Sequence, residues 1–328
     1  MEIFRLRKLL KSARQTSARW FGHQLKVCDT WTMDNSQETM QPQKVFPTQN
    51  KANPWHLIDY AHTAPDDFVI PEGHWPGFDI EGLDRGQRVR LNQLATVFMC
   101  EMFVHFEEYI VRFVERHKPR LTAHIREDKL DRFIEEEVDH INAFYALLKL
   151  FRPDEYPTSC LRMLKWSSAD DFLVKTASIP AFFFTAALFE EMTLYVVDVM
   201  NEDPTQSFAP VHSVMELHAK EEKSHVGIDN HLLRQTARER PRIVFLSQIA
   251  LSLPIIVYSN LALTRSWNRQ ARDFGQREGL SRAQTRRIAK RGLSSSDKLG
   301  LENFFRKQRK LAVPGGRAMS SLLELFTL

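Results

Sequence analysis

The sequence His218-Ala-Lys-Glu-Glu222-Lys-Ser-His225 places three candidate metal ligands on one face of a helix. At 100° per residue, the three side chains fall within about 60° of one another around the helix axis. An E-x-x-H pair like that of Glu222 and His225 also occurs upstream, at Glu137 and His140. Residues three apart share a helix face, so each pair can reach one point in space. One E-x-x-H arises by chance in helical proteins, but the doubled pattern indicates a shared metal site.

Each E-x-x-H follows a carboxylate that lies in an apolar stretch. Glu101 interrupts the run that begins at Leu94, and the adjacent Glu190 and Glu191 interrupt a run that begins at Ile179. A buried carboxylate without a partner costs several kcal/mol, so we expect a cation to meet each of these stretches. Glu108 is an alternative to Glu101. Of Glu190 and Glu191, only one is expected to face the centre.

The order Glu, E-x-x-H, Glu, H-x-x-x-E-x-x-H on four successive helices is typical of the carboxylate-bridged two-metal site of ferritin-like bundles. We therefore predict an all-α fold, a ferritin-like bundle with additional helices. The predicted helices span residues 85–117, 121–152, 168–201, 209–236 and 240–272, with one or two more in 281–312. Residues 1–25 are predicted to form a basic amphipathic helix. The six prolines within residues 30–85 predict an irregular segment packed on the body.

We place a boundary between an N-terminal part, 1–85, and a di-iron helical domain, 86–328, and expect the two to form one structural unit. The three cysteines, Cys28, Cys100 and Cys160, have neither disulfide nor zinc-finger spacing. Together with the lack of a signal peptide, this favours a cytoplasmic protein. Residues 243–264 carry no charge but hold several polar side chains, so we expect a bundle helix and no membrane span.

The net charge of +4 is uneven, with +10 over residues 265–310. We interpret this basic region as a solvated helical face or as a basic end packed on the acidic remainder of the chain, and we expect no nucleic-acid partner. Four glutamates carry a charge of −4 that two Fe(II) ions balance. Mixed carboxylate and imidazole ligands suit iron or manganese. These observations predict a pair of iron ions that activate dioxygen.

The two E-x-x-H pairs and the extra His218 resemble the di-iron arylamine N-oxygenase family, over about residues 90–320. The resemblance favours Glu191 over Glu190, because the 27-residue step from Glu191 to His218 is similar to that of the family. It also implies a complete set of ligands. Glu137 and Glu222 would bridge the irons, Glu101 and His140 would complete one iron, and Glu191, His218 and His225 would complete the other.

The resemblance further implies a homodimer that converts an aryl amine to the hydroxylamine and on to the nitro compound, through a peroxo di-iron(III) species. The substrate would be a small-molecule amine, free or bound to a carrier. Electrons would come from an external reductase or reductant, because the sequence has no flavin or iron–sulfur motif. The alternative is a di-iron hydroxylase or desaturase that acts on C–H bonds, although such relatives usually lack a ligand like His218. A radical-generating subunit or an iron-storage protein fits the sequence less well.

Overall fold

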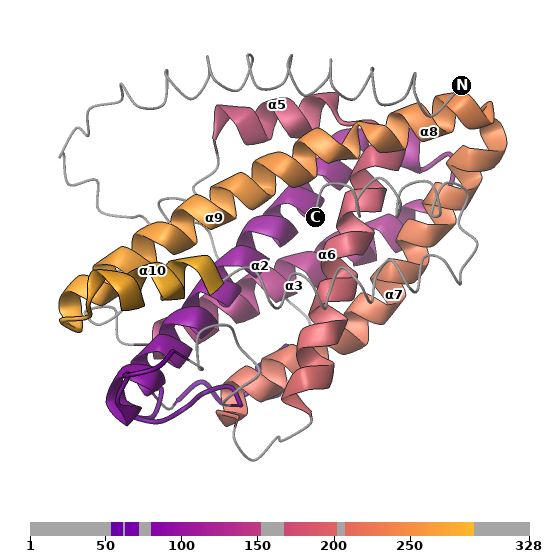
Figure 1. The fold of residues 1–328 in the computed structure, drawn as a ribbon. Coiled ribbons are helices and arrows are strands. Elements are labelled where there is room, and N and C mark those ends of the chain that lie inside the picture. The colour runs from indigo at the N-terminus through magenta and orange to yellow at the C-terminus, as the bar shows by residue number, and fades with distance from the viewer. Residues whose placement is uncertain (1–53, 62, 72–79, 152–166, 202–206, 292–328) are drawn as a thin grey trace, which may run out of the picture. The chain divides into compact units, whose positions relative to one another are not determined.

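Two long helical hairpins contain all the predicted ligands. In the computed structural model, α2 (Arg85–Leu121) packs along α3 (Glu127–Leu150), and α6 (Ile179–Met200) packs along α7 (Ala209–Glu239). α3 also contacts α7, so the hairpins form a four-helix bundle (Figure 1). The structure describes residues 54–61, 63–71, 80–151, 167–201 and 207–291, and within these ranges it contains no strand. The prediction of an all-α bundle is confirmed.

Helix α2 starts at a capping box, in which Asp84 accepts from the Gln87 backbone N–H and Gln87 accepts from the Asp84 backbone N–H. This reciprocal pair satisfies two backbone donors that the first turn leaves unpaired. Most of α2 is buried, because α3, α5 (Ser168–Thr176) and α9 (Ser252–Arg277) all pack against it. A helix with so few exposed positions shows little amphipathic pattern in its sequence.

Two of the predicted helices are each two helices in the structure. The predicted helix 168–201 divides into α5 and α6, with Pro180 in the first turn of α6. The predicted helix 240–272 divides at Leu251 into α8 (Arg242–Ala250) and α9, with Pro254 in the first turn of α9. Proline is tolerated in a first turn but not in a helix interior, so both breaks follow from these prolines.

The segment before α2 packs on the bundle through buried contacts. Trp55, in the short 3-10 helix η1 (Pro54–Leu57), is buried in the core, as are Val69 and Ile70. The buried Asn92 of α2 accepts from the backbone N–H of Val69 and donates to the carbonyl of Ile70. The boundary at residue 85 stays a prediction. The predicted helix 1–25, the prolines before residue 54 and the basic segment after residue 291 lie outside the described residues.

The apolar interior forms two clusters that meet at the level of the predicted ligands. The change from one cluster to the other falls between residues 106 and 109 in α2, 133 and 143 in α3, and 219 and 232 in α7. A layer of polar side chains fills these intervals, so the candidate site separates two apolar clusters in the centre of the bundle.

The most apolar helix of the bundle is α6. Over Ile179–Asp198 it is long and apolar enough to cross a membrane, but 81% of its most apolar stretch is buried inside the protein. Such burial is what a core helix shows. Residues 243–264, which raise the same question in the sequence, span α8, the break at Leu251 and part of α9.

Candidate metal centre

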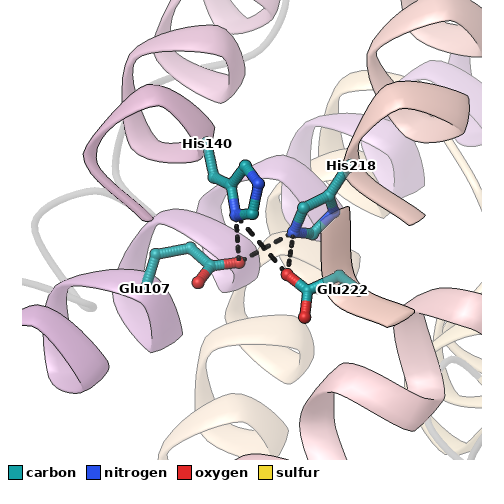
Figure 2. Close-up of side chains that lie close together, drawn as sticks. All are labelled: Glu107, His140, His218 and Glu222. Atoms are coloured by element: carbon teal, nitrogen blue, oxygen red, sulfur yellow. Dashed lines mark hydrogen bonds and ion pairs between the residues drawn. The ribbon is translucent and has the colours of Figure 1, made fainter. Parts of the chain in front are cut away.

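Two groups of buried side chains each bring their ligand atoms within 4.8 Å of one another. The first group is Glu107, His140, His218 and Glu222, shown in Figure 2. The second is Glu137, His140, Glu222 and His225. Because His140 and Glu222 belong to both, the two groups adjoin. Three of the four bundle helices, α2, α3 and α7, contribute to them.

In the first group, His218 lies against two carboxylates. Its Nε2 lies 2.7 Å from Glu222 Oε1 and 3.0 Å from Glu107 Oε1. His140 Nδ1 lies 3.4 Å from the same Glu222 oxygen and 3.9 Å from Glu107 Oε1 (Figure 2). Two nitrogens and two oxygens therefore point toward one another from three helices.

In the second group, His225 Nδ1 lies 3.0 Å from Glu137 Oε1 and 3.7 Å from Glu222 Oε2. His140 Nδ1 lies 3.5 Å from Glu137 Oε2. Glu222 thus turns one carboxylate oxygen toward each group. This is the disposition that a carboxylate needs to bridge two metal ions.

The first-helix acid in these groups is Glu107, whereas the sequence analysis predicted Glu101. The antiparallel hairpin explains the difference, because residues equally far from its turn lie at the same level. Glu107 lies 14 residues before the end of α2, and His140 lies 13 residues after the start of α3. Glu101 lies six residues further from the turn, about 9 Å along the helix axis. Neither Glu101 nor the alternative Glu108 belongs to either group.

The acid of α6 that faces the site is Glu190, whereas the resemblance favoured Glu191. Glu190 borders a cavity together with Glu107 and Glu222. Burial and the nearby carboxylates of Asp229, Glu222 and Glu137 raise its pKa well above the usual range. Glu191 is also buried but lies in neither group nor cavity. Sequence spacing between helices cannot resolve a single-residue step, which turns a side chain by 100°.

The buried charges of the site shift one another's protonation. Burial alone would lower the pKa of His218, but Glu222 and Glu107 raise it to about 10. Burial raises the pKa of Glu222, but His218 and the other two imidazoles outweigh it and bring the value to about 2. Burial and Glu137 raise the pKa of Glu107 well above its usual range. The arrangement therefore favours the charged forms of His218 and Glu222 and the neutral form of Glu107.

The donor set fits a pair of metal ions. Both oxygens of Glu137 and of Glu190 are buried without a hydrogen bond, as are the inward nitrogens of His140 and His225. Buried polar atoms normally have partners, so such a concentration of unpaired donors fits a bound cation. Carboxylates with imidazoles, and no thiolate among the described donors, suit iron or manganese.

Comparison with protein families adds an independent finding. The family described as p-aminobenzoate N-oxygenase AurF matches residues 79–310, most of the chain and all of the donors above. The chain belongs to this family. The AurF family consists of di-iron N-oxygenases, so the protein is an enzyme of the monooxygenase class. No curated protein and no solved structure matches the chain.

The family also implies a small-molecule substrate and a redox partner. The compartment and the homodimer remain predictions for this member of the AurF family. The roles of the individual donors as iron ligands belong to the proposal below.

In this AurF-family site, two outer carboxylates hold the histidines of α3 and α7. His140 Nε2 donates to Glu221 at 3.0 Å, and His225 Nε2 donates to Glu136 at 3.0 Å. The pairing is crossed, because each acid directly precedes the glutamate of the other E-x-x-H. Hydrogen bonds of this kind fix which nitrogen a histidine presents to a metal and increase its basicity. In the sequence, Glu136 and Glu221 are marked by their position directly before the glutamate of each E-x-x-H pair.

Two small cavities lie between α2 and α6, and the inner one adjoins the donors. The inner cavity, of about 10 Å³, is bordered by Glu107, Glu190 and Glu222. The outer cavity, of about 20 Å³, reaches Ile255 of α9. Both are bordered by Phe106 and Phe189, whose rings stack with centroids 3.6 Å apart. Each cavity has room for about one water molecule.

Proposed function

We propose that this AurF-family enzyme binds two iron ions in its polar layer and uses dioxygen to oxygenate the nitrogen of a small aryl amine. The main support is the pair of donor groups that share His140 and Glu222. Two adjoining groups of this kind, in a family of di-iron N-oxygenases, match a two-metal centre and no simpler site. An external reductase or reductant would supply the electrons.

The proposed ligands come from all four bundle helices. α2 gives one acid, α6 gives one acid, and α3 and α7 give the rest. The full set is Glu107, Glu137, His140, Glu190, His218, Glu222 and His225. When bound, the two irons would supply the electrons and the Lewis acidity that dioxygen reduction requires.

The chain's own residues would orient and enclose this centre. Glu136 and Glu221 hold His225 and His140 in the orientation that turns Nδ1 inward. The two apolar clusters exclude water from both sides of the polar layer, which strengthens every electrostatic interaction within it. The carboxylates fix the negative charge that neutralises the metal ions.

The substrate would approach from the side of α2 and α6. The inner cavity there touches three of the proposed ligands, and both cavities are otherwise bordered mainly by apolar and aromatic side chains. A flat aromatic ring suits such walls. Because each cavity has room for only about one water molecule, entry of an aryl amine would require Phe106 and Phe189 to move apart.

The test begins with the metal content of the purified protein after anaerobic loading with Fe(II). Two irons per chain are expected. The reduced protein is then exposed to dioxygen with aryl amines or with arenes of the same shape that lack the amine. Hydroxylamine or nitro products from the amines support the proposal. Hydroxylation or desaturation of carbon in both series would favour the C–H oxygenase instead, and a protein that retains no iron would contradict both.

A further inference from the structure

The hairpin formed by α9 and α10 (Arg282–Arg291) presents almost only positive charge to solvent (Figure 1). Residues 265–290 of this hairpin hold eight lysines or arginines against two acids. Of the two acids, Glu278 is held by α2, because both of its oxygens accept from the guanidinium of Arg90. The exposed cations are Arg265, Arg272, Arg277, Arg282, Arg286, Arg287 and Lys290.

This basic surface is not packed on an acidic part of the described chain. Six of its exposed cations form no ion pair among the described residues, namely Arg265, Arg272, Arg282, Arg286, Arg287 and Lys290. Elsewhere on the bundle, exposed arginines do have such partners, as Arg132 has in Glu136. A solvated helix usually mixes charges of both signs, so a surface of one sign points to a partner.

On both helices the cations lie opposite the side chains that pack inward. Ile288 is the buried residue of α10, and Arg286 lies about 160° from it around the helix axis. Trp267 is buried on α9, and Arg265 and Arg272 lie about 160° and 140° from it. The hairpin therefore has an apolar inner side and a basic outer side.

The basic stripe of α9 also includes an exposed leucine. Leu261 lies one turn before Arg265 and is 43% exposed. Leu261, Arg265 and Arg272 fall within about 40° of one another around the helix axis. An apolar side chain with a charged rim is the usual anatomy of a protein interface. Electron-transfer complexes bury little surface, so a stripe of this size is sufficient for one.

The inner side of the hairpin packs toward the candidate metal centre through aromatic side chains. Trp267 donates its indole N–H to the carbonyl of Ile288 at 3.1 Å, and its ring centroid lies 5.3 Å from that of Phe98 on α2. Further along α2, the ring centroid of Phe103 lies 5.3 Å from that of His218. Trp267, Phe98 and Phe103 belong to one apolar cluster. Electron transfer slows steeply with distance and with gaps in packing, so this hairpin suits the entry of electrons.

The basic surface could meet several kinds of partner, and the observations favour one. A second copy of the chain would bring the same cations to both sides of a two-fold interface, and like charges repel. A nucleic acid would match the charge but has no part in the oxygenation of a small amine. The proposed function requires electrons from outside the chain, and an acidic donor protein matches the charge as well.

We propose that the α9–α10 hairpin is the docking surface for a small acidic electron-transfer protein that carries an iron–sulfur cluster or a flavin. This inference rests on the proposed function and names the class of partner that supplies its electrons. Each docked donor would be oxidised by one electron, so two dockings would reduce both irons from the ferric to the ferrous state. Attraction between opposite charges would speed the encounter and make it sensitive to salt.

The first test measures binding to the metal-free protein. The probes are a plant-type [2Fe–2S] ferredoxin and a flavodoxin, both acidic, and surface plasmon resonance gives association rates from low to high salt. The variant Arg272→Glu/Arg282→Glu/Arg286→Glu reverses three exposed charges of the hairpin. With wild type, the association rate of at least one probe should fall steeply as salt increases. At about 0.1 M salt the variant should associate at least about tenfold more slowly.

The matched control changes the net charge equally at another place. Arg116→Glu/Arg120→Glu/Lys129→Glu reverses three exposed charges near the turn between α2 and α3. Arg116 lies 26 residues after Arg90, about 39 Å along the axis of α2 from the contact with Glu278. Because the Debye length is about 10 Å at 0.1 M salt, this control should associate within about threefold of wild type.

The second test follows the reduction of iron-loaded protein by stopped flow. Reduced ferredoxin or flavodoxin should reduce the hairpin variant at least about tenfold more slowly than wild type, when the donor is dilute. The methyl viologen radical, a small cation that needs no docking surface, should reduce the variant at least as fast as wild type. Slower reduction by both donors would mean that the variant disturbs the metal centre, and would contradict the inference.

The remaining outcomes separate this inference from the proposed function. If neither probe distinguishes the hairpin variant from the control, the inference is wrong, while the amine assay still decides the proposed function. Tighter binding of a short DNA duplex than of either probe would also overturn it and would assign the surface to nucleic acid. A protein that retains no iron contradicts the proposed function and removes the need for a donor.

Discussion

The α3/α7 side and the α2/α6 side of the bundle contribute different kinds of side chains to the candidate metal centre. α3 and α7 contribute all three histidines, and two of these donate hydrogen bonds to the half-buried Glu221 and Glu136, which hold them in place. α2 and α6 contribute single acids among aromatic side chains, and both acids border the inner cavity. The comparison teaches that one side holds its histidines in fixed orientations through hydrogen bonds, while the other leaves a small unfilled space beside its acids.

Loss of a ligand from the cavity side should have the largest effect. Glu107→Gln and Glu190→Gln each remove a charge that faces the site, so we expect iron content to fall to one per chain or less and activity to fall at least about 100-fold. Metal analysis and product assays would measure both. The buried neighbours provide matched controls, since Glu101→Gln and Glu191→Gln should keep two irons. The reverse pattern would contradict the placement of Glu107 and Glu190.

Loss of an outer carboxylate from the histidine side should have an intermediate effect. Glu136→Gln and Glu221→Gln keep every ligand but weaken the hydrogen bonds that orient His225 and His140. Such changes typically lower metal affinity or activity by about 10–100-fold. Competition with a chelator would give the affinity, and Glu135→Gln, at an exposed position of α3, is the control. Equal affinities in all three variants would show that the outer carboxylates do not orient the histidines.

A smaller change in the outer cavity should affect substrate rather than metal. Ala186 borders this cavity, and Ala186→Val would fill much of its 20 Å³. We expect KM for an aryl amine to rise about fivefold or more, with two irons still bound, because binding energy depends on shape at such a wall. Steady-state kinetics beside iron analysis would separate the two effects. A raised iron requirement with unchanged KM would place the substrate elsewhere.

The smallest expected effect is a pH dependence of the metal-free protein. Burial and neighbouring acids raise the pKa of Glu107 and Glu190 well above 4.5. Such acids stabilise the folded state below about 4.5, and this stabilisation is lost as the pH rises. Despite burial, carboxylates also raise the pKa of His218 to about 10 and that of His225 well above 6.5. Their contribution is complete below about 6.5 and is lost toward about pH 10.

His140, whose pKa burial lowers, offsets part of this trend. The melting temperature of the chelator-treated protein should therefore fall by roughly 5 °C or more between about pH 5 and pH 9. The metal-loaded protein should show no such fall, because bound metal keeps its ligands deprotonated. Melting temperatures measured against pH with and without metal would test this. The same fall in both samples would show that the groups that titrate are not metal ligands.

The same two sides differ in how far the sequence predicts them. On α3 and α7, the three-residue spacing of each E-x-x-H pair shows that its glutamate and histidine lie on the same face of one helix. The structure brings both pairs together, namely Glu137, His140, Glu222 and His225. On α2 and α6, a lone acid in a helix that is apolar on nearly every face has no internal reference. The height of this acid along the bundle depends on the length of the turn between helices. The direction in which it points depends on how its helix packs against the others.

The helix breaks were missed for a related reason. The apolar pattern of residues 168–201 continues through the boundary between α5 and α6, so only Pro180 marked the break.

The five residues 122–126 that join α2 to α3 set the level of Glu107 against His140. Exposed turns usually tolerate insertions and deletions, because few contacts depend on their length. Here one added residue would shift or rotate one helix against the other and misalign donors some twenty ångströms away along the hairpin. Natural variants of this chain should therefore vary in the composition of that turn far more readily than in its length.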